Sequence, residues 1–249
     1  MASLTDVAKW IQASRKIIGF TGAGISTHSG IPDFRSPGGV WSKNTTILFQ
    51  EFVDNYEDRV EYWRQKAAIW PAVRDAEPNN AHQFFVDLDR AGKLLGIITQ
   101  NIDGLHERSG VDGQKIVRLH GWMQEAVCLS CGTAVTMDAA CERLKDEPAP
   151  VCEQCAGLLK PATISFGQSL REGDLSRAAT LSTKCDLCLA VGSSLVVQPA
   201  AGFPEMASQN NARLVIINNT ATPLDRMADA VIREDIGTAV EQLKKAMRR

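Results

Sequence analysis

Short apolar runs alternate with segments of helical period along most of this chain, and this alternation limits the possible folds more than any other feature. The runs lie at 16–20, 94–99, 116–119, 162–166, 187–191, 214–217 and 230–232. Helical segments such as 81–91 and 237–247 separate several of them. Strands that alternate with helices build a parallel sheet covered by helices. The fold is therefore expected to be α/β, with ligands bound beyond the carboxyl ends of the strands.

Two stretches, 37–76 and 128–159, interrupt the alternation. The first is rich in aromatic and charged residues, and the second carries paired cysteines. We expect them to form a smaller lobe together, while 1–36, 77–127 and 160–249 form the main domain. At the start of the chain, Ser3 and Asp6 have the spacing of a capping box, which predicts a helix that ends near Ser14.

Four cysteines of the second stretch have the spacing of a metal site. Cys128 and Cys131 form one pair, Cys152 and Cys155 form another, and twenty residues separate the pairs. Pairs at this spacing converge on one tetrahedral zinc ion. Four thiolates leave no open coordination position, so the zinc is expected to hold the lobe together rather than to react. The alternative, four unrelated buried cysteines, is disfavoured by the regular spacing.

The remaining cysteines and the overall charge suggest where the protein works. Cys141, Cys185 and Cys188 are interpreted as packing residues, because no second pair is left to complete a site. The seven cysteines are an odd number, and no export signal or run near the roughly 20 apolar residues of a membrane span is present. We expect a cytoplasmic protein without membrane contact. The formal charge of −2 offers no basic field for direct nucleic-acid binding. The oligomeric state stays open, with a monomer as the simplest expectation.

A glycine-rich loop beginning at Thr21 follows the first apolar run. Gly22 and Gly24 would let backbone amides approach a phosphate group. The loop does not match the common dinucleotide fingerprint, because Thr27 occupies the third glycine position and no acidic residue stands about 20 positions on at a strand end. A different mode of nucleotide binding is therefore expected.

The order of several short motifs is more specific than this loop alone. The motifs are Gly22-Ala23-Gly24-Ile25-Ser26, Ser29-Gly30-Ile31-Pro32-Asp33-Phe34-Arg35, Thr99-Gln100-Asn101-Ile102-Asp103, His120-Gly121, Phe166-Gly167, Gly192-Ser193-Ser194-Leu195, Pro199-Ala200-Ala201, Ile217-Asn218 and Thr222-Pro223. In this order, and with the paired cysteines, the chain resembles the sirtuin family over essentially its whole length. The resemblance implies a Rossmann-like NAD-binding domain joined to a small zinc domain, with NAD and an acylated lysine meeting in the cleft between them.

The resemblance also implies an activity, that of an NAD-dependent protein lysine deacetylase or deacylase. Such an enzyme transfers the acyl group from lysine to ADP-ribose and releases nicotinamide and O-acyl-ADP-ribose. NAD is then the co-substrate, one zinc ion is structural, and the partners are acylated-lysine proteins or peptides. Two other interpretations stay open: a protein ADP-ribosyltransferase or NAD hydrolase that uses the same site, and a non-enzymatic zinc module that recruits partners.

Roles by position follow from the same resemblance. The residues expected to bind NAD are Gly22, Ala23, Gly24, Ser26, Asp33, Phe34, Arg35, Gln100, Asn101, Ile102, Asp103, Gly192, Ser193, Ser194, Asn218 and Ile236. The acylated peptide is expected to lie as an added strand between the loops 164–168 and 195–197. Its contacts would come from Ile164, Phe166, Gly167 and Val196.

His120 is the expected catalytic base, with Asn101 as the second catalytic residue. In the mechanism that the resemblance implies, a base must activate a ribose hydroxyl. Histidine suits this task because its ordinary pKa of about 6.5 leaves it mostly neutral near pH 7. His120 directly follows the predicted strand 116–119, where a catalytic residue of a parallel sheet is expected.

Other polar residues have structural interpretations. His82 is expected to start or pack a helix, His106 to form a structural hydrogen bond, and His28 to face solvent. Asp103 could instead be a turn residue, because Asp-Gly is a common turn pair. Arg35 could instead be the partner of a surface ion pair.

Several positions depart from the family pattern. Gln168 stands where glutamate is common, Trp122 where a small hydroxyl residue often follows the His-Gly pair, and 169–171 where Leu-Pro is expected. These departures leave the peptide preference open. Members that favour acidic acyl groups typically carry an arginine three residues after a tyrosine, but Tyr62 is followed by Gln65 at that spacing. We therefore expect acetyl and other uncharged acyl groups.

Overall fold

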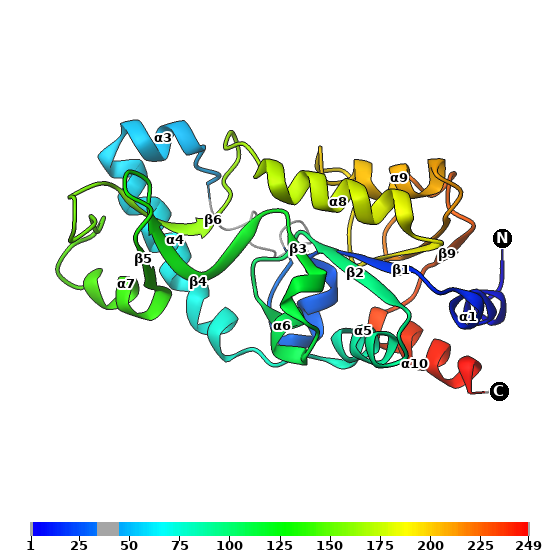
Figure 1. Ribbon diagram of the computed structural model, residues 1–249. Helices are drawn as coiled ribbons and strands as arrows, with labels where there is room; N and C mark the ends of the chain where they lie inside the picture. Colours follow the sequence, from blue (N-terminus) through cyan, green and yellow to red (C-terminus); the bar gives the residue numbers. More distant parts are fainter. Residues whose placement is uncertain (1, 34–44, 249) are drawn as a thin grey trace.

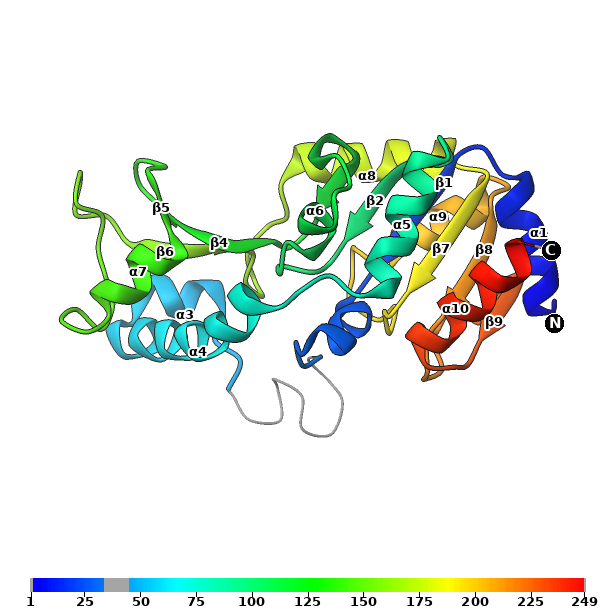
Figure 2. The same cartoon turned by 90° about the horizontal axis from the view of Figure 1, so that it is seen from below.

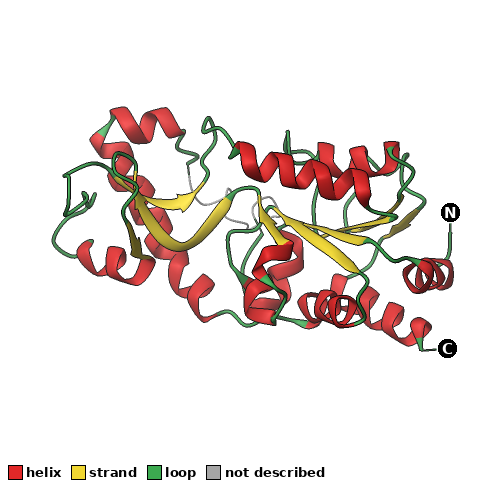
Figure 3. Ribbon diagram, viewed as in Figure 1, coloured by secondary structure: helices red, strands yellow, loops and turns green. Residues whose placement is uncertain are grey.

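The computed structural model describes residues 2–33 and 45–248. It is an elongated molecule with two lobes, and both termini lie at the far end of the larger lobe (Figure 1). Figure 3 separates the helices from the strands: the larger lobe is built on a six-stranded sheet and the smaller lobe on a three-stranded sheet.

The larger sheet is parallel throughout. Its strands are β1 (Ile17–Thr21), β2 (Leu94–Thr99), β3 (Ile116–Arg118), β7 (Leu187–Val191), β8 (Arg213–Ile217) and β9 (Ala230–Ile232). They follow the order β3-β2-β1-β7-β8-β9, and every neighbouring pair is parallel. The chain leaves β1 toward β2 on one side and later resumes at β7 on the other. This is a topological switch point, where parallel sheets open a crevice for ligands.

Helices cover both faces of this sheet (Figures 1 and 2). One face carries α1 (Leu4–Ala13), α5 (Asn80–Arg90) and α10 (Ile236–Met247), and the other carries α8 (Glu172–Lys184) and α9 (Gly202–Gln209). Alternate side chains of a strand point to opposite faces, so each strand contributes to two cores. The predicted α/β fold is confirmed. It could be predicted because strands buried on both faces appear in the sequence as continuous apolar runs.

Most of the predicted strands agree with the structure, and one is wrong. The runs 94–99, 187–191 and 230–232 coincide with β2, β7 and β9. The run 162–166 does not belong to the parallel sheet: the strand there is β6 (Leu159–Thr163), which pairs antiparallel with β4 (Gly121–Cys128). A short apolar run shows where a strand lies, but its periodicity does not reveal the strand that pairs with it.

The smaller lobe packs helices against the antiparallel sheet of order β5-β4-β6. Besides β4 and β6 it contains β5 (Ala134–Thr136), α3 (Phe49–Asp54), α4 (Tyr56–Asp75) and α7 (Met137–Arg143). The fully buried Trp63 of α4 donates its indole N–H to the Leu159 carbonyl at 3.2 Å. Trp70 donates in the same way to the Asp138 carboxylate at 2.7 Å. Two tryptophans with satisfied N–H groups therefore fix α4 to the rest of this lobe.

Shorter elements complete the chain. They are the 3₁₀ helices η1 (Ala23–Ser29) and η2 (Gly113–Lys115) and the helix α6 (Leu105–Ser109). The predicted capping box is confirmed: the amide of Asp6 donates to the Ser3 hydroxyl at 3.2 Å, and the amide of Ser3 donates back to the Asp6 carboxylate at 2.9 Å. Within 2–33 and 45–248, none of the helices combines the length and apolar character needed to cross a membrane.

Candidate active site and metal centre

Four thiols meet in the smaller lobe. The sulfur atoms of Cys128, Cys131, Cys152 and Cys155 all lie within 4.8 Å of one another, with 3.5 Å between Cys128 and Cys155 and 3.6 Å between Cys131 and Cys152. A zinc ion bound by four thiolates at about 2.3 Å requires sulfur separations of about 3.8 Å. The cluster therefore fits one tetrahedral zinc. The other three cysteines lie elsewhere, and Cys185 and Cys188 are buried in the core of the larger lobe as predicted.

The glycine loop lies at the switch point between β1 and β7. The amide of Gly24 donates to the Gly192 carbonyl at 2.9 Å, which joins the loops that follow these two strands. A Cβ atom on Gly22 would lie 2.7 Å from the Gly192 carbonyl oxygen, and one on Gly24 would lie 2.8 Å from the Gly192 Cα atom. No side chain fits at either position. Gly22 and Gly24 lie so close to Gly192 that, at these positions, only backbone atoms face the carboxyl edge of the sheet.

Three polar side chains connect η1 to the loop after β2. The hydroxyl of Ser26 donates to the Asp103 carboxylate at 2.7 Å and accepts from the Asn101 side-chain amide at 3.1 Å. Burial raises the pKa of Asp103, and the hydrogen bonds from Leu105 and Ser26 oppose that effect. These residues line a small pocket. Its lining residues are Ala23, Ser26, Ile31, Pro32, Ile69, Val73, Asn101, Ile102 and Asp103.

His120 follows β3 and faces the same loop. Its Nδ1 atom lies 3.1 Å from the backbone carbonyl oxygen of Gln100. A carbonyl oxygen only accepts hydrogen bonds, so Nδ1 carries the proton in the neutral ring and Nε2 keeps its lone pair. Burial lowers the pKa of His120, and the bond to the carbonyl partly opposes this. The ring is thus neutral near pH 7, with its basic nitrogen unprotonated.

Further predicted NAD-binding residues follow β7, β8 and β9 along the same edge. The Gln100 side-chain amide donates to the Ser193 hydroxyl at 2.8 Å, across the switch point. Asn218 follows β8, and its carbonyl accepts from Arg233 at 2.9 Å. Ile236 is buried at the first turn of α10. Ser194 also lies in the loop after β7. Asp33 is the last described residue before the gap, and Phe34 and Arg35 lie outside the described residues.

The predicted peptide-contact residues expose apolar groups. Phe166 and Val196 are 44% and 56% exposed, which is unusual for side chains of this size. Ile164 is joined to the segment of His120, since its amide donates to the His120 carbonyl at 2.8 Å. Gly167 has a φ of +81°, and the neighbouring Phe166 carbonyl accepts from the Phe49 amide at 2.8 Å. The loop is therefore tied to both lobes.

The hydrogen bonds of Tyr62 were not predicted from the sequence. The buried hydroxyl of Tyr62 lies 3.1 Å from the Thr163 hydroxyl and 2.9 Å from that of Ser165, on either side of Ile164. Burial alone would raise the pKa of Tyr62, but nearby Lys66 and Lys160 and these hydrogen bonds lower it to about 7. No local motif marks this arrangement, because α4 and β6 are far apart in the sequence.

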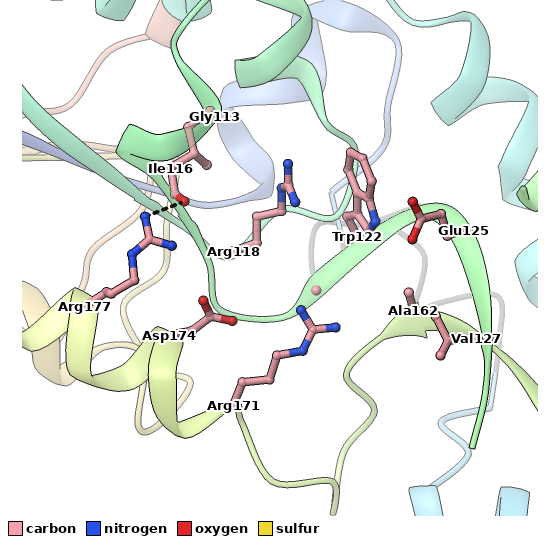
Figure 4. Close-up of a pocket in the computed structure, with 11 residues that line it drawn as sticks. Gly113, Ile116, Arg118, Trp122, Glu125, Val127, Ala162, Arg171, Asp174 and Arg177 are labelled. Carbon is pink, nitrogen blue, oxygen red and sulfur yellow. Dashed lines mark hydrogen bonds between the residues drawn. The ribbon is translucent and has the colours of Figure 1, made fainter. Parts of the chain in front are cut away.

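A second hollow of about 380 Å³ lies along the outer side of β3, β4 and α8 (Figure 4). Arg118 points toward Trp122 in this view, with its guanidinium 4.0 Å from the centre of the indole ring. Arg118 also pairs with Glu107 at 2.5 Å, and Arg177 donates to the Ile116 carbonyl. Trp122 therefore serves here as a packing surface for an arginine. Arg118 and Arg177 of this hollow thus already have partners within the protein.

The other histidines agree with their structural interpretations, with one difference. His82 caps α5, since its Nδ1 accepts from the Asn79 amide at 3.2 Å, and His106 lies 2.9 Å from the Thr21 hydroxyl. His28 is half exposed as expected, but it also forms an ion pair with Asp235 at 2.6 Å. This pairing could not be predicted, because 207 positions separate the two residues.

The fold and the site together define a nucleotide-binding enzyme of the parallel-sheet class with an attached four-thiol lobe. A sequence model of the Sir2 family matches residues 22–199. The chain is 49% identical over 227 residues to "NAD-dependent protein deacetylase 1" of Bradyrhizobium diazoefficiens, covering 91% of this chain and 89% of that protein. The chain belongs to the Sir2 family.

Solved structures give the same result. A complex described as Sir2 with a p53 peptide and NAD⁺ superimposes with a TM-score of 0.89 at 34% identity, covering 98% of both chains. The structure of Sir2Tm bound to a propionylated peptide gives a TM-score of 0.86 at 34% identity, covering 99% of this chain and 98% of that one. The similarity therefore includes both lobes.

Proposed function

We propose that this member of the Sir2 family is an NAD-dependent protein lysine deacylase. It transfers the acyl group of an acylated lysine to ADP-ribose and releases nicotinamide and O-acyl-ADP-ribose. The observation that carries the proposal is the neutral His120, whose Nδ1 is held by the carbonyl of Gln100, the residue next to Asn101 of the Asn101–Ser26–Asp103 cluster at the carboxyl edge of the sheet. Relatives named NAD-dependent protein deacetylases and a neighbour with bound peptide and NAD⁺ support it.

NAD would bind along the carboxyl edge at the switch point. Gly22, Ala23 and Gly24 would hold the pyrophosphate, since the absence of side chains lets backbone amides approach it. The adenosine half would lie against the ends of β7 and β8 and the start of α10. The residues proposed for it are Gly192, Ser193, Ser194, Asn218 and Ile236.

The nicotinamide end would occupy the small pocket. Asp103 accepts hydrogen bonds there and is suited to a carboxamide N–H, with Ile102 as an apolar wall. Gln100 and Asn101 would hold the ribose, and Ser26 would keep Asn101 and Asp103 in place. Asp33, Phe34 and Arg35 would cover this end and exclude water from the reacting carbon.

His120 would act as the general base on a ribose hydroxyl. Its proton lies on Nδ1, held by the Gln100 carbonyl, so Nε2 is free to accept one. Asn101 would orient the ribose so that this transfer occurs in a near-attack geometry. No nucleophilic side chain is required, since the acyl-lysine oxygen itself attacks the sugar.

The peptide would add as a strand between the loops 164–168 and 195–197. Backbone hydrogen bonds would give the affinity, with Ile164, Phe166, Gly167 and Val196 as contacts. Uncharged acyl groups are proposed because Gln65 stands three residues after Tyr62 and donates to the Thr45 carbonyl and to Glu61. The adjacent Arg64 is 61% exposed and paired with Glu61. A propionylated peptide bound to a neighbouring structure agrees with this class of substrate.

Zinc, compartment and assembly belong to the same proposal. Four thiolates saturate the zinc, which would then stabilise the small lobe and take no part in the reaction. A reducing cytoplasm would keep these thiols available for the metal. We propose a monomer as the simplest active form.

Purified protein with NAD and an acetyl-lysine peptide tests the proposal. We expect nicotinamide, deacetylated peptide and O-acetyl-ADP-ribose in equal amounts, and a loss of at least about a hundredfold in His120→Ala, since removal of a general base typically costs 10²–10⁴-fold. An unacetylated peptide is the control. ADP-ribose attached to protein, or nicotinamide release that does not need the acetyl group, would instead support the transferase or hydrolase interpretation.

A further inference from the structure

Four buried polar side chains behind the NAD edge have no role in the proposed reaction. Thr21, Thr99, His82 and His106 are each at most 3% exposed, so none of them touches a substrate. They come from β1, β2, α5 and α6 and meet between the sheet and the helices. Thr21 and Thr99 are paired neighbours in the parallel β1–β2 register, which brings their side chains to the same face.

The donor and acceptor of each hydrogen bond in this group can be assigned by starting from Asn101. Its backbone N–H donates to the Thr99 hydroxyl oxygen at 3.0 Å, and this oxygen also accepts from the Thr21 hydroxyl at 2.9 Å. The Thr21 hydroxyl proton is therefore already donated to Thr99. Thr21 therefore accepts from Nε2 of His106, which lies 2.9 Å away, and the proton of neutral His106 is on Nε2.

At His82, the other end of the group, a second backbone donor determines which ring nitrogen carries the proton. The Asn79 N–H donates to Nδ1 of His82 at 3.2 Å, so the proton of neutral His82 is also on Nε2. Burial lowers the pKa of His82 to about 4 and that of His106 well below its usual range, so both rings are neutral at pH 7.

Two ring nitrogens of these histidines make no hydrogen bond to a described residue. Nε2 of His82, a donor, and Nδ1 of His106, an acceptor, are buried without a hydrogen-bond partner in the described part of the chain. The two rings pack edge to face with their centres 5.1 Å apart. The opposite tautomer of His106 would break the bond to Thr21. The bond to Thr21 therefore fixes the proton arrangement of His106, and the bond from Asn79 fixes that of His82.

This group ends on the peptide bond that holds the base. The N–H of Asn101 and the C=O of Gln100 belong to one planar peptide group. Its N–H donates to Thr99, and its C=O accepts from Nδ1 of His120. Hydrogen bonds in series polarise one another, so a donor bond made by the N–H strengthens the carbonyl as an acceptor.

We propose that His82, His106, Thr21 and Thr99 are positioning residues: they hold the Gln100–Asn101 peptide so that His120 keeps its proton on Nδ1 and its basic Nε2 free. The catalytic part of this inference rests on the proposed deacylase function. The proton arrangement of the two buried histidines does not, and it is measurable on the protein without substrate.

Nitrogen NMR of the ring atoms tests the arrangement directly in the zinc-loaded wild-type protein. For His82 and His106 we expect a protonated Nε2 and an unprotonated Nδ1 at every pH from 6 to 8, and for His120 a protonated Nδ1 at pH 8. A protonated Nδ1 on His106, or a charged ring on either buried histidine at pH 7, would overturn the inference.

Kinetics of matched variants test the effect on the base. Thr21→Val removes the hydroxyl and is expected to lower kcat at least about tenfold with the peptide KM changed less than about threefold, since small misplacements at a reacting centre cost up to about a hundredfold. Thr21→Ser keeps the hydroxyl and should restore most of the rate. Ser182→Ala, which removes another fully buried hydroxyl on α8, is the control and should leave kcat unchanged.

The possible outcomes separate the two claims. Equal kcat values in wild type, Thr21→Val and Thr21→Ser, each with full zinc content and native circular dichroism, would overturn the positioning role. The same follows if Ser182→Ala lowers kcat as much as Thr21→Val. A wild-type protein that releases no nicotinamide from any acylated peptide would refute the proposed function instead, and the NMR result would then decide the proton arrangement by itself.

Discussion

At the scale of single residues, the burial of His120 should set the pH dependence of the proposed reaction. Burial disfavours the imidazolium, so the pKa of His120 lies below its ordinary value of about 6.5. The base works only when neutral. We therefore expect kcat/KM to be flat from about pH 7 down to about 6.5 and to fall only as the pH decreases through the lowered pKa. Initial rates with saturating NAD would measure this.

The control for that measurement is the stability of the fold. His82 has a pKa of about 4 in the folded chain and about 6.5 when unfolded, so its contribution to stability is complete above pH 6.5 and is lost as the pH falls toward 4. Rates should be compared only at pH values where urea unfolding shows the protein fully folded. An acid limb of kcat/KM with a midpoint above 6.5 would contradict the neutral, buried base.

Some of the residues discussed above can be predicted from the sequence, and others cannot. The four clustered cysteines and the proposed base His120 could be singled out from the sequence because they lie in short motifs with fixed spacing. The Thr21–Thr99 contact was not found, because it exists only once β1 and β2 pair in register. The same applies to His28 and Asp235, which meet across 207 positions. Local patterns report chemistry within a segment, whereas these contacts depend on how segments pair.

At the scale of elements, the β4–β6 pair depends on one glycine beside His120, the proposed base. Gly121 has a φ of +72°, and a Cβ atom there would lie 2.1 Å from the Ala162 carbonyl oxygen. We expect Gly121→Ala to lower the free energy of unfolding by at least about 2 kcal/mol, because both the backbone conformation and the strand pairing are incompatible with a side chain. Urea denaturation would measure the loss.

Gly113→Ala is the matched control for this variant. A Cβ atom at Gly113 meets no atom within 4 Å, and its φ is not in the left-handed region. Its unfolding free energy should stay within about 0.5 kcal/mol of wild type. If Gly121→Ala were as stable as Gly113→Ala, the backbone next to His120 would be less constrained than the structure indicates.

Elements are easier to predict than the sheets they join. Runs that are buried on both faces, such as β2 and β7, were located to the residue. The run 162–166 was shifted and assigned to the wrong sheet, since the real strand β6 is buried in the small lobe although it carries Lys160 and Thr163, and it contributes Leu159 to the core there. Burial produces the same sequence pattern in both sheets, and only the partner strand distinguishes them.

At the scale of the whole molecule, the two lobes have different sources of stability. The larger lobe has two extensive apolar cores, one on each face of its sheet. The smaller lobe has one core, between α4, β4 and α7. The boundaries 37–76 and 128–159 stay a prediction, and β4 and β6 both extend beyond them. The metal should therefore contribute most to the stability of the smaller lobe, which has a single core and lies at the end of the molecule far from the termini (Figure 1).

Removal of zinc should consequently unfold one lobe before the other. Structural zinc bound by peptide thiolates contributes about 10–16 kcal/mol to folding, and Cys131 and Cys155 are exposed to a chelator. We expect chelation to abolish amide protection in β4–β6 and α7 while β1, β2, β7 and β8 stay protected, as measured by hydrogen exchange. Cys131→Ser should lower the metal content from one zinc per chain, whereas Cys141→Ser, outside the cluster, should not. A chelated protein that kept full protection in β4 and full activity would show that the thiol cluster stabilises the lobe without a metal.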